Sequence, residues 1–265
     1  MSDPHVEELR YAVRMEHPRA RMADDAVLKC VELGPFQCQI SREGTLIAMA
    51  QQHFASQDEA RAVLEPYLRA WESHADLTVD FRLRFAFQAA KVVDRDPVAD
   101  QPAARGKALK LRWDPQAPTL IVQAWPPLPP GGLRETDEAR WLRMRWLAAV
   151  DGKEDLVATA GWVLTKLAQS YGQGERSEAA RSLFVDCRVL DRVGELSAVG
   201  VPMRGRGGDG EAGALTPDEM AWLKKAVPRL ILRAAEVESL PHPLPMLRID
   251  GLQGGSLWAY PATEE

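Results

Sequence analysis

The segment FRLRFAFQ, residues 81–88, decides the fold class of this chain. Apolar and polar side chains alternate along it, and a period of two residues indicates a β-strand with one buried face. The large apolar side chains then share the face toward the core, while Arg82 and Arg84 share the face toward solvent. We therefore expect a sheet at this point of the chain.

Other segments predict further strands of the same sheet. Residues 36–40 and 45–51 flank Ser41-Arg42-Glu43-Gly44, in which the glycine supplies the positive φ of a hairpin turn. The other expected strands are residues 10–16, residues 27–33, which end at Gly34-Pro35, and Val92-Val93, which continues or follows the segment 81–88.

One helix is expected between these strands. Ser56 and Glu59 have the spacing of a capping box, in which the Ser hydroxyl accepts an early helix N–H and the Glu reaches back. Pro66 removes one backbone donor and should bend this helix. Apolar residues at helical spacing predict one buried face: Ala60, Val63, Leu64, Tyr67, Leu68 and Trp71. Residues 1–125 are thus predicted as an α+β domain, an antiparallel sheet with one packed helix.

The sequence PPLPPGG, residues 126–132, marks a domain boundary. It fits neither a helix nor a central strand, because proline lacks the backbone donor. We interpret residues 126–134 as a semi-rigid proline-rich linker. A docking motif for a polyproline-binding domain is the alternative. Two further strands are expected before it, at 109–113 and 119–125.

Residues 135–265 have the pattern of a helical domain with an irregular tail. The clearest helix start is Thr216-Pro217-Asp218-Glu219, which combines a cap, a proline in the first turn and a Glu that closes a capping box. This helix should reach about Val237 and bend at Pro228. The other helices are expected from the cap Thr136 to Val150, over 156–170, from the cap Ser177 to Phe184, and over 187–196.

The composition is that of a globular protein. Of the 265 residues, 46% are hydrophobic and 27% are charged, and the net charge of −5 favours neither nucleic acid nor an anionic membrane. Three cysteines, Cys30, Cys38 and Cys187, are a sparse and odd set, which favours a reducing compartment. Cys30 and Cys38 could face one another in a hairpin, but two half-buried thiols are the favoured interpretation. Without a signal peptide or a membrane-spanning apolar run, we expect a soluble cytoplasmic protein.

Residues 65–72, EPYLRAWE, and 92–97, VVDRDP, resemble the front half of a group of bacterial hypothetical proteins. Residues 189–197, VLDRVGELS, and 215–223, LTPDEMAWL, resemble their back half. These stretches are mainly caps and core positions rather than chemical motifs. The resemblance implies a two-part architecture and a bacterial origin, and it implies no activity because the group has none established.

The sequence carries no signature of a metal site, a cofactor or a covalent catalyst. The five histidines are scattered, and neither His-x-x-x-His nor Cys-x-x-Cys occurs. A Gly-x-Ser-x-Gly elbow is also missing. The glycine-rich residues 205–210 do not open a helix, so we interpret them as a flexible linker. We therefore predict no metal and no cofactor.

Arg69 and His74 form one spacing that is typical of catalysis. The same Arg-x4-His pattern occurs in certain helical ribonucleases, where the Arg would stabilise the charge of a phosphorane and the His would transfer a proton. Those enzymes place the pair in a four-helix domain, whereas here it ends a helix that leads into a strand. A metal-independent ribonuclease-like enzyme is therefore an alternative function.

Two sets of residues are candidates for binding a partner. Arg82 and Arg84 would meet nucleic acid, although the aromatic residues needed for stacking lie on the opposite face of their strand. The eight tryptophans are more than a chain of this size usually carries, and most fall on helical stripes and are expected in the core. Trp125, beside the prolines, and Trp258, in the tail, are expected to be partly exposed and to contact another protein.

We therefore favour a non-enzymatic binding or accessory protein of a bacterial multi-protein system, acting through protein–protein contacts. A nucleic-acid-binding module and the ribonuclease-like enzyme are the alternatives. The sequence names neither the partner, nor the pathway, nor the oligomeric state.

Overall fold

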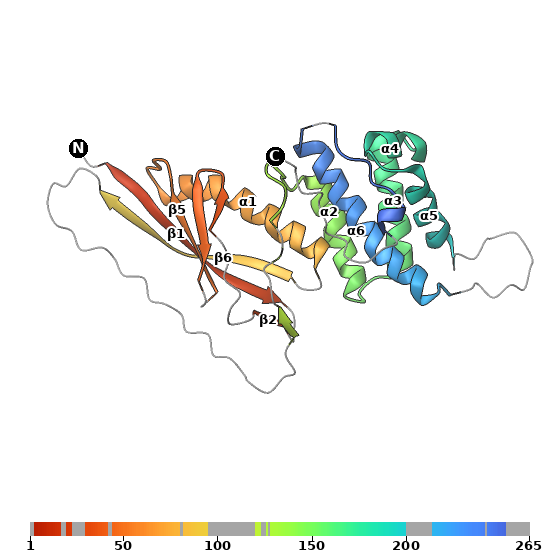
Figure 1. The fold of residues 1–265 in the computed structure, drawn as a ribbon, viewed down its shortest axis with the longest axis horizontal. Helices are drawn as coiled ribbons and strands as arrows, with labels where there is room; N and C mark the ends of the chain where they lie inside the picture. The colour runs from red at the N-terminus through yellow and green to blue at the C-terminus, as the bar shows by residue number, and fades with distance from the viewer. Residues whose placement is uncertain are drawn as a thin grey trace, which may run out of the picture. The chain divides into compact units, whose positions relative to one another are not determined.

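The computed structural model describes residues 3–16, 20–22, 30–41, 44–79, 82–94, 120–122, 126, 128–199, 214–241 and 243–252. The chain divides into two compact units, Met1–Pro129 and Pro130–Glu265, and the division falls inside the proline-rich segment 126–132. The first unit is a sheet with one packed helix, and the second is built of helices (Figure 1). The predicted α+β architecture is therefore confirmed.

Five antiparallel strands form the sheet of the N-terminal unit, in the order β3-β4-β5-β1-β6. The predicted strand at 36–40 is confirmed, and the one expected at 45–51 ends a residue earlier. Of the strand expected at 27–33, residues 31–33 are strand and 27–29 lie outside the described residues. The bounds are β1 Pro4–Glu16, β3 Val31–Leu33, β4 Phe36–Ile40, β5 Thr45–Ala50 and β6 Arg82–Asp94.

The strand β6 continues through Val92 and Val93 and pairs with β1 along the full length of both strands. For the same reason β1 begins at Pro4, six residues before its expected start. Gln88 is the extra residue of a β-bulge in β6, because Ala89 lies opposite Arg10 while Phe87 lies opposite Tyr11. The alternating sequence pattern therefore stops at the residue where the pairing register shifts.

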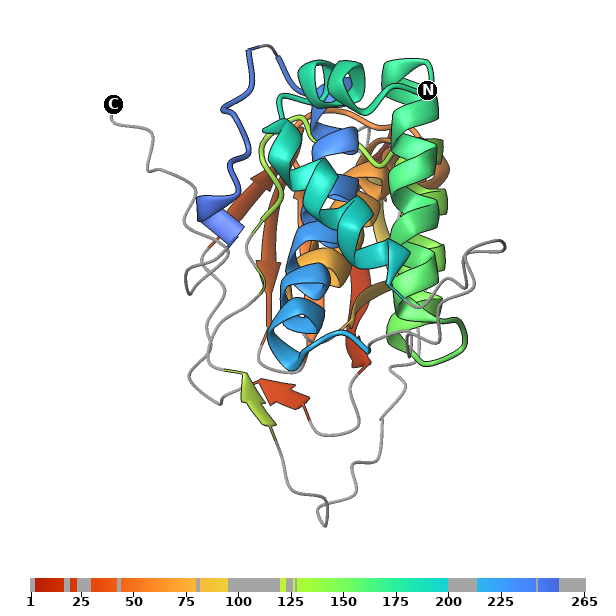
Figure 2. The same cartoon turned by 90° about the vertical axis from the view of Figure 1, so that its right-hand side faces the viewer.

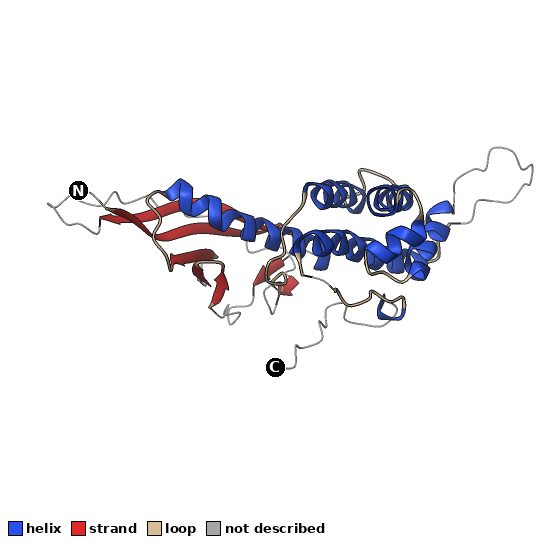
Figure 3. Cartoon of the chain, turned by 90° about the horizontal axis from the view of Figure 1, so that it is seen from above, coloured by secondary structure: helices blue, strands red, loops and turns tan. Residues whose placement is uncertain are grey.

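The helix α1, Gln57–Thr78, packs on one face of this sheet (Figure 3). The rings of Trp71 and Phe85 lie 5.3 Å apart, and both side chains are buried, as the sequence predicted. The core joins α1 to the strands through Leu9, Tyr11, Phe36, Cys38, Leu46, Phe54, Leu64, Leu68, Trp71, Leu83 and Phe85. On the other face of β6, Arg82 and Arg84 are only partly exposed.

The start of α1 is capped as expected, with one difference. The Ser56 hydroxyl accepts a hydrogen bond from the Glu59 amide (3.2 Å), while the Glu59 carboxylate accepts one from Ala55 instead of from Ser56 (2.9 Å). The helix also ends later than expected, at Thr78, so that His74 lies inside it.

Two short strands pair separately from the main sheet. These are β2, Ala20–Met22, and β7, Leu120–Val122, and they are parallel. The strand β7 lies within the expected strand 119–125, whereas the strand expected at 109–113 lies outside the described residues.

Five α-helices form the described part of the C-terminal unit (Figure 2). The helix α2 contacts both α3 and α6, and α3 also contacts α4 and α5. Their bounds are α2 Asp137–Val150, α3 Leu156–Gly172, α4 Arg176–Ser182, α5 Cys187–Ala198 and α6 Pro217–Ser239. After α6 the chain is irregular up to a short 3₁₀ turn, η1, Asp250–Leu252. Of the helices that the structure describes, none is both long and apolar enough to cross a membrane.

The caps of these helices follow the sequence with one exception. Thr216 and Glu219 form the expected capping box, and Thr136 accepts a hydrogen bond from the Ala139 amide (3.2 Å). The prediction that Ser177 caps α4 is wrong. Glu175 occupies the N-cap position without a side-chain bond, and Ser177 lies in the first turn.

Replacing Thr216 by Ala should lower the free energy of unfolding by about 1 kcal/mol, because one amide at the start of α6 loses its acceptor. Ser177→Ala is the matched control and should change that free energy by less than about 0.5 kcal/mol. Urea denaturation followed by circular dichroism measures both. Equal losses in the two variants would contradict the assigned caps.

Candidate functional site

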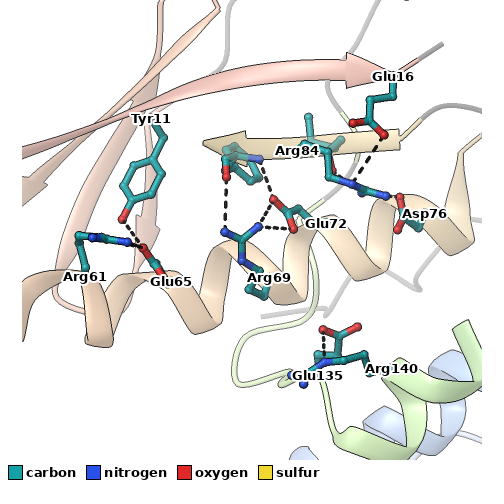
Figure 4. Close-up of polar contacts among 12 residues, drawn as sticks. Tyr11, Glu16, Arg61, Glu65, Arg69, Glu72, Asp76, Arg84, Glu135 and Arg140 are labelled. Carbon is teal, nitrogen blue, oxygen red and sulfur yellow. Dashed lines mark hydrogen bonds and ion pairs between the residues drawn. The ribbon is translucent and has the colours of Figure 1, made fainter. Parts of the chain in front are cut away.

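The edge of the sheet at β6 is closed by side chains of α1. Phe85 lies opposite Val13 in the β1–β6 pair, and the Val13 amide donates to the Gly44 carbonyl on the other side of β1. Val13 and Phe85 are therefore a non-hydrogen-bonded pair, and the backbone N–H and C=O of Phe85 point away from β1. The Glu72 carboxylate accepts a hydrogen bond from the Phe85 amide (2.6 Å). Arg69 donates to both Glu72 oxygens (2.6 Å each) and to the Phe85 carbonyl (3.5 Å) (Figure 4). The two side chains thus take the place of a neighbouring strand.

Arg84 makes a second connection between β6 and α1. Its guanidinium donates to the Asp76 carboxylate (2.8 Å) and to the Leu83 carbonyl (2.6 Å), and it lies 3.9 Å from Glu16 (Figure 4). The Asp76 side chain has no exposed surface, so this pair is shielded from screening by salt. The charge of Arg84 is therefore balanced within the unit.

Arg69 and His74 do not share a face of α1. Five residues along an α-helix rotate a side chain by about 140° relative to the first one. The Arg69 side chain is 44% exposed and paired with Glu72, while His74 is 1% exposed. The arrangement that would expose both a cation and a proton carrier to one substrate is therefore not formed by these two side chains.

A third polar group links β1 to α1. The Tyr11 hydroxyl donates to Glu65 (3.5 Å), which also accepts from Arg61 (2.8 Å) (Figure 4). The Arg61 guanidinium also lies over the ring of Phe87, 4.3 Å from its centroid. Burial and the nearby Glu65 carboxylate raise the pKa of Tyr11 to about 12. Tyr11 is therefore a neutral hydrogen-bond donor at physiological pH.

Side chains that could hold a metal are not grouped among the described residues. His5 and His53 stack with ring centroids 5.4 Å apart, and His53 lies 3.8 Å from Asp3. His17 and His242 lie outside the described residues.

The tryptophans divide differently from what the sequence predicted. Trp71 and Trp146 are buried and Trp162 and Trp222 are partly buried, but Trp141 is 66% exposed although it lies on a helical stripe. The two tryptophans expected to contact a partner, Trp125 and Trp258, lie outside the described residues, as does Trp113.

Trp141 belongs to a connected apolar patch on α2 and α3. Met144, one turn further along α2, is 62% exposed, and the Trp162 ring of α3 lies 6.1 Å from the Trp141 ring. The Arg145 guanidinium lies over Trp162, 4.1 Å from the ring centroid. We name these four residues the Trp141 surface. Isolated exposed apolar side chains are common, whereas a contiguous exposed set is a candidate for a binding surface.

Part of the Trp141 surface is held in place by hydrogen bonds within the helical unit. Glu154 accepts a hydrogen bond from Arg145 (2.9 Å) and another from the Thr159 hydroxyl (3.3 Å). Arg145 is thereby fixed over Trp162, which lowers the side-chain entropy that binding would cost. Sequence reasoning missed Trp141 because α2 carries apolar residues on two helical stripes, and only the packing shows which stripe is covered. The covered stripe is Ala139, Leu142, Trp146 and Ala149, whereas Trp141 and Met144 lie on the other.

No family model matches this chain, and neither a curated protein nor a solved structure is significantly similar to it. The resemblance to bacterial hypothetical proteins therefore stays a prediction.

Replacing Glu72 by Ala should lower the free energy of unfolding by about 2–3 kcal/mol, because the Phe85 amide loses a charged acceptor. Glu72→Gln keeps an acceptor oxygen and should lose less. The matched control is Glu178→Ala, since Glu178 also pairs with an arginine three residues away but is half exposed. Its loss should stay below about 1 kcal/mol. Chemical denaturation measures the three variants, and equal stability of Glu72→Ala and the wild type would refute the stabilising role of the Glu72–Phe85 hydrogen bond.

Two of the three thiols should react quickly with a disulfide reagent at pH 8. Cys30 and Cys187 are exposed, whereas Cys38 is buried, and burial raises its pKa to about 12. The thiolate is the reactive form, so Cys38 should react only when the chain is unfolded. Cys38→Ala should remove the slow thiol and leave two fast ones. A single fast thiol in the wild type would contradict the exposure of one of these two cysteines.

Proposed function

We propose that this chain is a non-enzymatic binding protein that contacts another protein through the Trp141 surface. The observation that carries the proposal is the exposure of Trp141 and Met144 beside the fixed Arg145–Trp162 stack. Trp, Met and Arg are the residue types enriched at protein interfaces, and exposed Trp side chains often supply much of the binding energy. A role as an accessory protein in a bacterial multi-protein system would use such a surface.

The partner is expected to offer an apolar pocket rather than a knob. Trp141 is 66% exposed on α2, and beside it the Arg145 guanidinium lies over the Trp162 ring. If the Trp141 indole entered an apolar pocket of the partner, the neighbouring Trp162 and Arg145 side chains would help to exclude water from it, as in well-packed interfaces.

The two alternative functions have less support. Catalysis by Arg69 and His74 would require the Arg69–Glu72 pair to break and His74 to become accessible. Nucleic-acid binding through Arg82 and Arg84 would compete with the Arg84–Asp76 pair, and the aromatic side chains of β6 face the core. At both of these sites the charged groups are paired or buried, whereas the apolar side chains of the Trp141 surface are exposed.

Trp141→Ala should weaken the complex with the natural partner by at least about 30-fold, which is the loss expected for a hot-spot residue of 2 kcal/mol. Native mass spectrometry of the chain purified from its own host identifies the partner. Calorimetry with the purified partner then measures the affinity of each variant.

Val92→Ala is the matched control, because Val92 is also an exposed apolar residue but lies in the sheet unit. It should bind like the wild type. Unchanged affinity of Trp141→Ala would refute the Trp141 surface as the site, and salt-sensitive binding of RNA lost on Arg82→Glu and Arg84→Glu would favour the nucleic-acid alternative.

A further inference from the structure

After α6 the chain turns back along the helical unit as an extended segment, residues 243–252, drawn in dark blue in Figure 2. We name it the strap. Prolines at 241, 243 and 245 cannot donate backbone hydrogen bonds, so the strap forms no helix before η1. What holds it must therefore come from the helices beside it.

Backbone groups between α4 and α5 hold the middle of the strap. The Leu247 amide donates to the Phe184 carbonyl (2.9 Å), and the Asp186 amide donates to the Leu247 carbonyl (2.9 Å). These two bonds make a parallel β-bridge between Leu247 and Val185. Such pairing is the way in which proteins bind extended peptides through the main chain. Phe184 has a φ of +52°, a left-handed backbone that is strained for a bulky residue.

A buried arginine holds the strap at Pro245, two residues before Leu247. Arg233 of α6 is 1% exposed and donates to the Pro245 carbonyl (2.9 Å). Its guanidinium is also paired with Glu236 at 3.0 Å, which fixes its direction. A buried cation is costly unless its donors are used, and the Pro245 carbonyl of the strap accepts one of these bonds.

The strap itself contributes few side chains to this contact. Met246 is 53% exposed, and Pro243, Pro245 and Arg248 are also exposed. Leu252, at the end of the strap, is the deeply buried one. A segment held mainly by two backbone–backbone hydrogen bonds and one bond from the Arg233 side chain opens at a lower free energy than the helices beside it. The same three bonds could be made by another peptide of the same backbone shape.

We infer that residues 184–186 and Arg233 form a peptide-binding site, which the strap occupies in the isolated chain. The ligand class is an extended, proline-containing segment of a partner protein, with a carbonyl that reaches Arg233 and, two residues later, a residue with a free amide that pairs with Val185. The tethered strap competes at an effective concentration in the millimolar range. The site is therefore closed until the strap is displaced, and this inference does not depend on the Trp141 surface.

The test uses a fluorescent peptide of residues 241–252 and three full-length chains. Leu247→Pro removes the amide that bonds to Phe184 and should release the strap, whereas Met246→Ala changes an exposed side chain and serves as the matched control. Fluorescence anisotropy should show the peptide binding to Leu247→Pro at least tenfold more tightly than to the wild type or to Met246→Ala. A peptide that itself carries Leu247→Pro should not bind any of the three chains.

Absence of peptide binding to a folded Leu247→Pro chain would overturn the inference. If Leu247→Pro does not fold, hydrogen exchange of the wild type decides. Exchange of the Leu247 and Asp186 amides at least 100-fold faster than that of the central amides of α6 supports a strap that opens locally. Exchange at the same rate as those amides would show that the strap is part of the global fold.

Discussion

The hydrogen bond from the Phe85 amide to the buried Glu72 carboxylate is the contact on which the N-terminal unit depends. An edge strand presents backbone donors and acceptors that must be bonded or hydrated, and an uncovered edge invites pairing with other chains. Glu72 and Arg69 satisfy both groups of Phe85, and the packing of Trp71 against the Phe85 ring places α1 so that they can. The position of α1, the closed edge of the sheet and the Arg69–Glu72 pair therefore depend on one another.

The same constraint governs the C-terminal unit at another place. The connection between α4 and α5 leaves the Phe184 carbonyl and the Asp186 amide to be bonded, and the strap satisfies both through Leu247. In the sheet unit the partner groups are carboxylate and guanidinium; in the helical unit they are another stretch of backbone. The side chains of Glu72 and Arg69 belong to a packed helix, so they stay bonded to the edge of the sheet. The strap is a tethered segment that can detach by local opening, and its binding groups would then become accessible to another peptide.

Residues with the chemistry of a catalyst are used structurally in this fold. Arg69 and Arg84 have the charge that a phosphate would need, yet Glu72 and Asp76 balance that charge. Acidic residues at these positions of α1 were visible in the sequence, but their reach to β6 was not. Among the large apolar side chains that the structure describes, Trp141 and Met144 of α2 are the most exposed, and Arg145 is held over Trp162 beside them. The interaction partners of Arg69 and Arg84 therefore say more about their role than the residue types alone.

The sequence by itself determined the class of fold and most of the element positions, because these follow from local periodicity and caps. The alternation at 81–88, the cap at Ser56 and the capping box at Thr216 each act within a few residues. Tertiary structure alone decided the sheet order, the bulge at Gln88 and the exposure of Trp141. It also decided the partners of Arg69 and of the strap. These features depend on contacts between residues far apart in the chain. Helical periodicity alone does not say which face of a helix another element will cover.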